Sequence, residues 1–337
     1  MYEKKFTLLG LPLWSASIIL TIAIWITGAV ATSSEFSLSN PSELVLVFQK
    51  QNDPVSVKKS ADAVGAYLEK ELGVKVSVRV PSDYSASVQA LVSKKADFAY
   101  TSSLPFLLAR RDGGASIVLA EQRTDVFGKQ RTEYDSVLVV DKNSPVNSLD
   151  DVLADSKKIR LMFTSPTSTS GYLFPYATFV KRGLLQAKQD PREVFQTVGF
   201  AGSYTQALEE VIAGRADVAA VSFYTVEGDS AATYLSPEKL KSLKIIARIP
   251  GVPTHVLSAR SGLSPELIKD FKEAVLKLSV EHPEIFTDVY GTASFVEVSE
   301  NDHVSETIVS VDYLGLPIEG LAGVTLLAEK NKSNKPL

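Results

Sequence analysis

The amino-acid sequence predicts an α/β protein made of two similarly built lobes that are joined by a hinge of two crossing strands. Apolar runs typical of strands alternate with amphipathic helical stretches, which favours parallel sheets. A pattern of turn, helix and strand occurs twice with the same spacing. Two extended apolar segments are placed to carry the chain from one lobe to the other and back.

The first elements are read from local signals. Residues 44–48 form an apolar run typical of a buried strand, and Asp53-Pro54 resembles an N-cap followed by proline at the first helical position. An apolar stripe at spacings of three and four follows, which predicts an amphipathic helix. Its positions are Val57, Ala61, Val64, Leu68 and Leu72. Residues 75–80 alternate between polar and apolar side chains and predict the next strand.

The first 31 residues predict a signal peptide or a membrane anchor. Lys4 and Lys5 precede an apolar run from about residue 6 to residue 30, which ends in an A-x-A sequence at residues 29–31. These features describe a secretory signal. The run is also long enough to span a bilayer, so an uncleaved anchor stays open. In both cases the positive-inside rule places the rest of the chain across the membrane, and we expect a periplasmic location.

Composition excludes several classes of function. The 337 residues include no cysteine, which rules out disulfides and a lipid-modified N-terminal cysteine. The three histidines lie far apart without metal-ligand spacing, so we expect no metal and no cofactor. A net charge of −4 without a long basic block argues against nucleic acid as a partner. There is no G-x-S-x-G elbow, and we do not expect a serine hydrolase or another enzyme.

The repeated pattern places the same turn in each lobe. Tyr84 precedes Asp97 by 13 residues, and Tyr204 precedes Asp217 by the same distance. Generic α/β units would also give this pattern. The sharper interpretation is two lobes whose turns lie at the carboxyl edges of their sheets, where α/β folds bind ligands. The hydroxyl residues 101–103 (TSS) are either further donors for such a cleft or a cap for the next helix.

The predicted crossing segments are residues 136–141 (SVLVVD) and 245–259. They assign residues 43–136 and 252–325 to lobe 1 and residues 137–251 to lobe 2. Two crossing strands form a hinge, which suits a cleft that closes on a ligand. The polar tail from about residue 330 is expected to be frayed.

The stretch PTSTSGYLFP, which ends at Pro175, carries three adjacent hydroxyl residues, Ser168, Thr169 and Ser170. It follows a predicted strand at residues 159–163. Proline is tolerated only near the first turn of a helix, so a helix begins within this motif. Free helical amides and neutral hydroxyl donors suit a compact oxyanion with several acceptor oxygens. An ordinary N-cap beside a solvated loop is the alternative.

Five stretches, taken in order, carry a resemblance to a known family. They are residues 132–153, 168–175 (STSGYLFP), 201–208 (AGSYTQAL), 214–221 (GRADVAAV) and 249–253 (IPGVP). Together they resemble the phosphonate/phosphite/phosphate-binding proteins of ABC transporters over about residues 43–260. The resemblance implies a type II periplasmic binding protein fold that closes over a tetrahedral phosphorus oxyanion and partners an ABC permease. We expect a monomer.

The resemblance also implies which residues touch the ligand. Ser168, Thr169 and Ser170 match the hydroxyls that hold the phosphoryl oxygens. Tyr134 matches a cleft tyrosine that precedes the first crossing strand, and Tyr84 matches the tyrosine of the turn in lobe 1. Packing in the hinge for Tyr134 and a helix-start role for Tyr84 remain the alternatives.

Two departures from the family pattern bear on specificity. The turn of lobe 2 ends in Ser203-Tyr204, which we expect to bind the ligand, and lacks the histidine that often stands there. Tyr224 and Val252 match positions where members that bind aminoalkylphosphonates carry acidic residues. Neither can pair with an ammonium group, whose desolvation is costly without a counter-charge. We therefore expect phosphite, phosphate or a short alkylphosphonate rather than aminoethylphosphonate. An arsenic oxyanion stays open.

The predicted function is the extracytoplasmic solute-binding component of an ABC importer, with no catalytic role. A sensor subunit that presents its bound ligand to a membrane kinase is the alternative, because the binding site would be the same.

Overall fold

The computed structural model describes residues 40–315 except residues 126 and 293. The predicted signal or anchor at residues 1–31 and the polar tail lie outside the described residues, as do residues 316–325 of the predicted lobe 1. Within the described ranges, no helix is both long enough and apolar enough to cross a membrane.

The elements alternate between strands and helices along much of the chain. The strands are β1 (Glu43–Phe48), β2 (Lys75–Arg79), β3 (Phe98–Thr101), β4 (Ser116–Thr124), β5 (Gln130–Arg131), β6 (Glu133–Asp141), β7 (Arg160–Phe163), β8 (Thr197–Phe200), β9 (Val218–Ser222), β10 (Leu243–Pro253), β11 (Val256–Ala259) and β12 (Ser294–Val296). The α-helices are α1 (Pro54–Leu72), α2 (Tyr84–Val92), α3 (Ser103–Gly113), α4 (Leu149–Ala154), α5 (Phe174–Lys181), α6 (Tyr204–Ile212), α7 (Pro237–Leu240), α8 (Pro265–Glu281), α9 (Pro283–Tyr290), α10 (Glu300–His303) and α11 (Ser305–Tyr313). A π-helix (Thr169–Leu173) precedes α5, and short 3-10 helices occupy Ser156–Lys158, Pro191–Glu193, Phe223–Thr225 and Asp229–Thr233.

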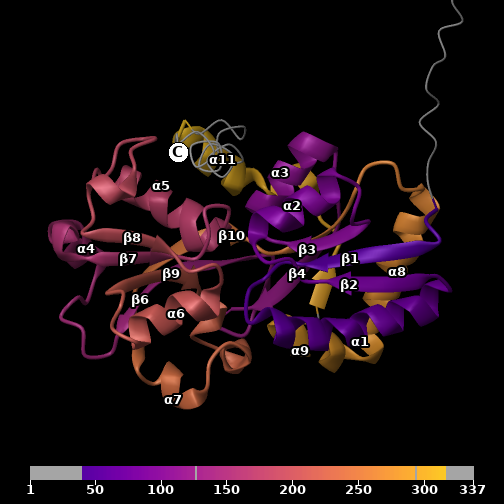
Figure 1. Cartoon of the computed structure of the whole chain (residues 1–337), viewed down its shortest axis with the longest axis horizontal. Coiled ribbons are helices and arrows are strands. Elements are labelled where there is room, and N and C mark those ends of the chain that lie inside the picture. The colour runs from indigo at the N-terminus through magenta and orange to yellow at the C-terminus, as the bar shows by residue number, and fades with distance from the viewer. Residues whose placement is uncertain (1–39, 126, 293, 316–337) are drawn as a thin grey trace, which may run out of the picture. The chain divides into compact units, whose positions relative to one another are not determined.

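The strands of the described residues form two sheets (Figure 1). The first has the order β12-β4-β11-β3-β1-β2, with β5 beside β4, and the second has the order β10-β6-β9-β7-β8. Strands β1, β2 and β3 pair in parallel, as do β7, β8 and β9. Each sheet is completed by antiparallel strands, among them β11 and β4 in the first sheet and β6 and β10 in the second. The predicted α/β class with two lobes is confirmed.

Two connections cross between the sheets, as the sequence predicts. The chain leaves the first sheet after β5 and enters the second as β6, and it returns through β10 to β11. Residues 133–136 and 252–253 pair within the second sheet. Helix α11 follows the strands of the first sheet in the chain but packs against α5 and β10. The division of the chain into lobes at residues 136/137 and 251/252 remains a proposal.

The two lobes share the predicted turn at the start of a helix. Tyr84 is the first residue of α2, and Tyr204 is the first residue of α6. Asp83 caps α2 by accepting a hydrogen bond from a backbone amide three residues on, and Ser203 caps α6 in the same way. Each cap satisfies an amide that has no partner within its helix.

The two aspartates at the matched spacing also perform the same task. A carboxylate oxygen of Asp97 accepts from the amide of Val45 at 2.8 Å, and one of Asp217 accepts from the amide of Arg160 at 2.8 Å. The second oxygen of Asp97 accepts from Arg260, and that of Asp217 accepts from the side chain of Arg160. Each aspartate thus ties the strand it precedes to a neighbouring strand.

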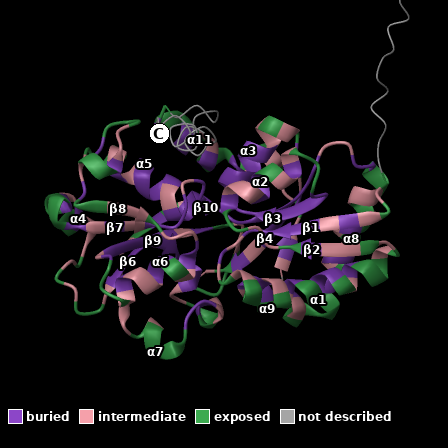
Figure 2. Ribbon diagram, viewed as in Figure 1, coloured by how far each residue is buried: buried purple, intermediate pink, exposed green. Residues whose placement is uncertain are grey.

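Apolar side chains bury both sheets between layers of helices. Helices α2 and α3 cover one face of the first sheet and α1 and α9 cover the other, while α5 and α6 lie on opposite faces of the second sheet (Figure 1). The strands are largely buried, and exposed residues gather on the outer surfaces of the helices (Figure 2). In the first lobe, Phe98 stacks on Phe271 with ring centroids 3.7 Å apart. This packing holds the parallel strands rigidly, and with them the turns that follow their carboxyl ends.

Candidate functional site

The stretch with Ser168, Thr169 and Ser170, here called the hydroxyl turn, follows strand β7 and begins with a wide helical turn. The backbone amide of Leu173 donates to the carbonyl oxygen of Ser168 at 3.0 Å, five residues back, as in a π-helix. The hydroxyl of Ser168 caps this turn by accepting from the amide of Gly171 at 3.0 Å. A Cβ atom at Gly171 would lie 2.2 Å from Oγ1 of Thr164, so only glycine fits there. Pro175 lies in the first turn of α5, as predicted.

Ser170 lies at the centre of a group of hydroxyl side chains, here called the hydroxyl cluster: Tyr134, Ser170, Tyr204 and Ser222. Its Oγ lies 2.9 Å from the phenol oxygen of Tyr204 and 2.7 Å from Oγ of Ser222. The phenol of Tyr134 donates to the same atom at 3.3 Å. The hydroxyl of Ser136 fixes the turn by donating to the carbonyl of Ser170 at 2.6 Å. All of these residues are buried.

Thr169 connects the turn to the first lobe. Its Oγ1 accepts from the amide of Leu104 at 2.9 Å and from the hydroxyl of Ser103 at 3.3 Å. Both donors belong to the first turn of α3. Ser102, the cap residue of this helix, makes no side-chain capping bond, and its hydroxyl donates instead to Oε1 of Gln49. Residues 101–103 are therefore not an ordinary cap, because Ser103 faces the hydroxyl turn.

Tyr84 contributes a phenol with no hydrogen-bond partner within residues 40–315. The side chain is fully buried, and its hydroxyl is unpaired. Burial, together with neighbouring phenols of which Tyr204 is the strongest influence, raises the pKa of Tyr84 well above its ordinary value. Burial likewise raises the pKa of Tyr134 and of Tyr224. These phenols stay protonated near neutral pH and remain hydrogen-bond donors.

Other buried polar atoms of the first lobe also lack a hydrogen-bond partner in the part of the chain that the structure describes. They include Nε2 of Gln49 and of Gln51, the hydroxyls of Ser87, Tyr100 and Thr101, Oε2 of Glu121 and both ring nitrogens of His255. Gln49 and Gln51 follow β1, Thr101 ends β3 and His255 precedes β11. Native interiors seldom leave polar groups unpaired, so this concentration indicates a place for a polar ligand.

His255 lies in this interior, although the turn of lobe 2 has no histidine. Its ring stacks on Tyr134 with centroids 6.1 Å apart and meets Tyr224 at 6.3 Å. It comes from the second crossing segment and was not among the predicted site residues. The interior therefore contains an imidazole that is supplied by another element than the turn of lobe 2.

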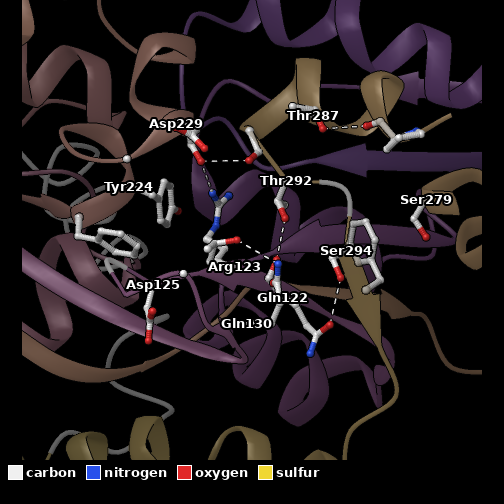
Figure 3. A pocket seen from close by; sticks show the side chains of 18 of the residues that line it. Gln122, Arg123, Asp125, Gln130, Tyr224, Asp229, Ser279, Thr287, Thr292 and Ser294 are labelled. Carbon is white, nitrogen blue, oxygen red and sulfur yellow. Dashed lines mark hydrogen bonds between the residues drawn. The ribbon is translucent and has the colours of Figure 1, made fainter.

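A buried ion pair adjoins Tyr224. The guanidinium carbon of Arg123 lies 3.6 Å from the centroid of the Tyr224 ring, and the two side chains face each other in Figure 3. Nε of Arg123 donates to Oε1 of Glu121. Nη2 donates to the carbonyl of Tyr290 at 3.0 Å, and Nη1 donates to Oγ of Ser230 at 3.4 Å. Burial alone would raise the pKa of Glu121, but Arg123 and His255, whose Nδ1 lies 3.8 Å from Oε1 of Glu121, lower it overall, so the carboxylate is ionised.

The two predicted specificity residues both adjoin Tyr134 of the hydroxyl cluster. Tyr224 is buried, donates to Oε1 of Gln51 at 3.1 Å and packs its ring edge-to-face on Tyr134. Val252 is also buried and pairs with Tyr134 across strands β10 and β6. Of the other predicted residues, Ser203 uses its hydroxyl to cap α6, where it accepts from the amide of Gln206 at 3.2 Å. The hydroxyl of Ser203 also donates to Oε1 of Gln206 at 3.2 Å, so it bonds within α6 and not to the hydroxyl cluster.

Two cavities lie beside this interior rather than within the hydroxyl cluster. Arg123 and Tyr224 line a cavity of about 750 Å³, together with residues from both lobes (Figure 3). Arg123 and Tyr134 line a second cavity of about 220 Å³. Tyr224 therefore contacts the hydroxyl cluster through its ring and also forms part of the cavity wall. Across residues 40–315, apart from 126 and 293, no group of three or more metal-binding side chains is placed to hold a metal ion.

Comparisons with known proteins identify the family of this chain. A family model described as "ABC transporter, phosphonate, periplasmic substrate-binding protein" matches residues 46–303. The phosphonates-binding periplasmic protein of Escherichia coli (strain K12) is 35% identical over 204 residues, which make up 60% of this chain and 56% of that protein. The probable ABC transporter phosphite binding protein PhnD1 of Prochlorococcus marinus (strain MIT 9301) is 26% identical over 275 residues, 79% of this chain and 88% of that protein.

Solved structures show the same fold. The structure of PhnD1 from Prochlorococcus marinus (MIT 9301) in complex with methylphosphonate aligns with a TM-score of 0.68 at 23% identity, covering 82% of this chain and 99% of that one. A binding protein component of an ABC phosphonate transporter from Pseudomonas aeruginosa aligns with a TM-score of 0.68 at 21% identity, covering 86% of this chain and 98% of that one. Because the family model matches most of the chain, this protein belongs to the periplasmic substrate-binding proteins of phosphonate ABC transporters.

Proposed function

We propose that this protein binds a small tetrahedral oxyanion between its two lobes and delivers it to an ABC permease. The ligand class is phosphite, phosphate or a short alkylphosphonate. The observation that carries the proposal is the convergence of neutral hydroxyl donors on Ser170 and Thr169 at the place where the lobes meet. In this account Ser168 is the cap of the turn, while Thr169 and Ser170 hold ligand oxygens.

Neutral donors suit an oxyanion that must bind reversibly. Each phosphoryl oxygen accepts two or three hydrogen bonds, and charge-assisted bonds of this kind are stronger than neutral ones. Tyr84, Tyr134 and Tyr204 offer phenols, and the first turn of α3 adds backbone amides beside Thr169. The unpaired amide groups of Gln49 and Gln51 supply further donors from the first lobe. An anion bound here would replace the contacts that these groups make with one another.

The surface for the ligand's substituent comes from the aromatic wall. Tyr224 packs on Tyr134 with ring centroids 5.2 Å apart, and His255 contacts both rings. Such a wall offers apolar surface to a hydrogen atom or a short alkyl group. The relatives fit this proposal: their names refer to phosphonates and phosphite, and one of the similar structures contains methylphosphonate.

The remaining parts of the proposal concern location and partners. Residues 1–31 would direct the chain across the inner membrane and then be cleaved or retained as an anchor. The folded part would act as a monomer in the periplasm without catalytic activity. An ABC permease would recognise the closed form, as the family description implies.

Calorimetric titration tests the ligand class. Phosphite, phosphate, methylphosphonate, aminoethylphosphonate and arsenate would each be titrated into the purified protein. We expect saturable binding of at least one of the first three, and loss of that binding in the double variant Ser168→Ala with Thr169→Val. Tight binding of aminoethylphosphonate alone, or unchanged binding by the double variant, would overturn the proposal.

A further inference from the structure

Next to the hydroxyl cluster lies a group of residues with the chemistry of a cation site. It consists of one fully buried carboxylate, Glu121, together with the ring of Tyr224 and the backbone carbonyl of Tyr290. A carboxylate, an aromatic face and a carbonyl oxygen are the groups that bind an ammonium or guanidinium ion away from water. In this protein the cation that occupies the site is the protein's own Arg123 side chain.

Arg123 is held on several sides at once. Its guanidinium bonds Glu121 and the carbonyl of Tyr290, lies 3.6 Å from the centroid of the Tyr224 ring and reaches Ser230 of the other lobe. Only 3% of the residue is exposed. A buried arginine with this many partners is fixed in place, because breaking a buried pair leaves an uncompensated charge.

The position of this cation relative to the hydroxyl cluster is set by two rings. Tyr134 donates to Ser170 through its hydroxyl and packs its ring on Tyr224, whose ring in turn contacts Arg123. A ligand whose phosphoryl group is held at Ser170 would therefore lie beside rings that are backed by a resident positive charge, and a substituent that extends toward these rings would meet aromatic surface. That charge is matched by Glu121, so the pair as a whole is neutral.

We infer that Arg123 is a specificity-determining residue, which fills the cation site of the cleft with its own guanidinium and so excludes ligands that carry an ammonium group. The inference rests on the proposed function, since it concerns the substituent of the same ligand. An incoming ammonium group would find no free counter-charge, because Glu121 is already paired with Arg123. Uncharged hydrogen or alkyl substituents meet only aromatic surface. The selectivity against amines thus rests on Arg123 in addition to the specificity positions Tyr224 and Val252.

The test compares pairs of ligands that differ in one amino group. Ethylphosphonate and 2-aminoethylphosphonate form one pair, and propylphosphonate and 3-aminopropylphosphonate form the other. In wild-type protein we expect the alkyl member to bind about 100-fold or more tightly than the amino member, because a desolvated ammonium group without a counter-charge is costly. In Arg123→Gln the ratio should fall to about threefold or invert for at least one pair, since Glu121 becomes free to accept the ammonium group.

Two further variants separate this mechanism from a general loss of structure. In the double variant Glu121→Gln with Arg123→Gln, discrimination against the amine should return, because no counter-charge remains for a desolvated ammonium. Arg123→Lys keeps a cation and should keep the wild-type selectivity. Circular dichroism would confirm that each variant is folded. If Arg123→Gln does not fold, Arg123→Met, which keeps most of the side-chain length without its charge, takes its place with the same expected fall in the ratio.

The outcomes distinguish the inference from the proposed function. Wild-type protein that binds none of these ligands, nor phosphite or phosphate, would contradict the proposed function itself. Wild-type protein that binds alkyl and amino members equally would overturn only the role of Arg123. The same holds if folded Arg123→Gln keeps its selectivity, or if the double variant gains amine binding as the single variant does.

Discussion

The side-chain oxygen of Thr169 accepts a hydrogen bond from the backbone amide of Leu104 at 2.9 Å, and this bond joins the hydroxyl turn of the second lobe to the first turn of helix α3. Both groups are buried. The two lobes therefore meet through a polar contact at the point where the proposed ligand binds. A ligand oxygen beside Thr169 would lie within reach of donors from both lobes, so binding and closure of the hinge would be coupled.

Thr169→Val should destabilise the ligand-free protein. Valine has nearly the same shape but cannot accept from the amide of Leu104, and an unpaired buried amide costs about 1–3 kcal/mol. Urea unfolding measures the change in the free energy of unfolding. Thr178→Val is the matched control, because its hydroxyl donates within its own helix to Phe174, and it should change stability by less than about 0.5 kcal/mol. Equal effects of the two variants would show that the contact contributes nothing to stability.

Tyr84→Phe should separate binding from stability. The hydroxyl of Tyr84 has no partner among the described residues, so its removal should leave the free energy of unfolding within about 0.5 kcal/mol of wild type or raise it. Oxyanion affinity should fall about tenfold, because a bond to a charged acceptor is lost. Tyr290→Phe is the comparison: its hydroxyl donates to the carbonyl of Gln49, and its loss should cost about 1 kcal/mol of stability. A Tyr84→Phe variant that binds as wild type does would remove Tyr84 from the site.

The ion pair of Glu121 and Arg123 predicts a pH dependence of stability. The pKa of Glu121 is lowered in the folded protein from its ordinary value of 4.5. Its contribution is therefore complete above about pH 4.5 and is lost as the pH falls through the lowered pKa. Glu121→Gln should cost about 3 kcal/mol at pH 7, because it leaves Arg123 buried without a counter-charge.

Urea unfolding of wild type and Glu121→Gln at pH 7 and at pH 3 checks this prediction. The difference in the free energy of unfolding between the two proteins should shrink at the lower pH, where the wild-type carboxylate takes up a proton. Glu238→Gln, at an exposed position of α7, serves as the control and should differ little from wild type at either pH. A difference that stays constant between pH 7 and pH 3 would contradict the ionised state of Glu121.

Asp217→Asn should destabilise the second lobe. Burial alone would raise the pKa of Asp217, but the hydrogen bonds and charge of Arg160 lower it, which indicates a stabilising carboxylate. Replacing it weakens the charge-assisted bonds to the backbone and side chain of Arg160, and we expect a loss of about 1–2 kcal/mol in the free energy of unfolding. Asp150→Asn removes an exposed pair with Arg182 and should cost less than about 0.5 kcal/mol. Equal losses in the two variants would show that Asp217 stabilises the protein no more than an exposed ion pair does.

The elements that local signals define were predicted well from the sequence. Helix α1 begins at Pro54 after the Asp53 cap, as the pattern indicates, and the hydroxyl turn follows β7. The equal spacing of Tyr84 to Asp97 and of Tyr204 to Asp217 correctly indicated two turns of the same construction. These features depend on neighbouring residues in the chain, so a single sequence carries enough information.

The residues missed by sequence analysis depend on long-range packing. Glu121 and Arg123 lie in β4, and His255 immediately precedes β11. A strand pattern shows that such side chains alternate between faces, but it does not show which face meets the other lobe. The available signal was a pair of charged residues and a histidine in or beside otherwise apolar strands. The π-helical first turn was missed as well, because its shape follows from the close contact of Gly171 with Thr164.

The central claim is that the hydroxyl cluster binds the oxyanion, and Ser170→Ala tests it most directly. Ser170 contacts Tyr134, Tyr204 and Ser222 through one oxygen atom, and its loss removes the centre of the cluster. Calorimetric titration with phosphite, phosphate and methylphosphonate should show one binding site in the wild-type protein. The affinity of folded Ser170→Ala should be at least about 30-fold weaker, as expected for a lost bond to a charged acceptor in a buried site. Equal affinity of the two proteins, or no binding of these ligands to the wild type, would contradict the account.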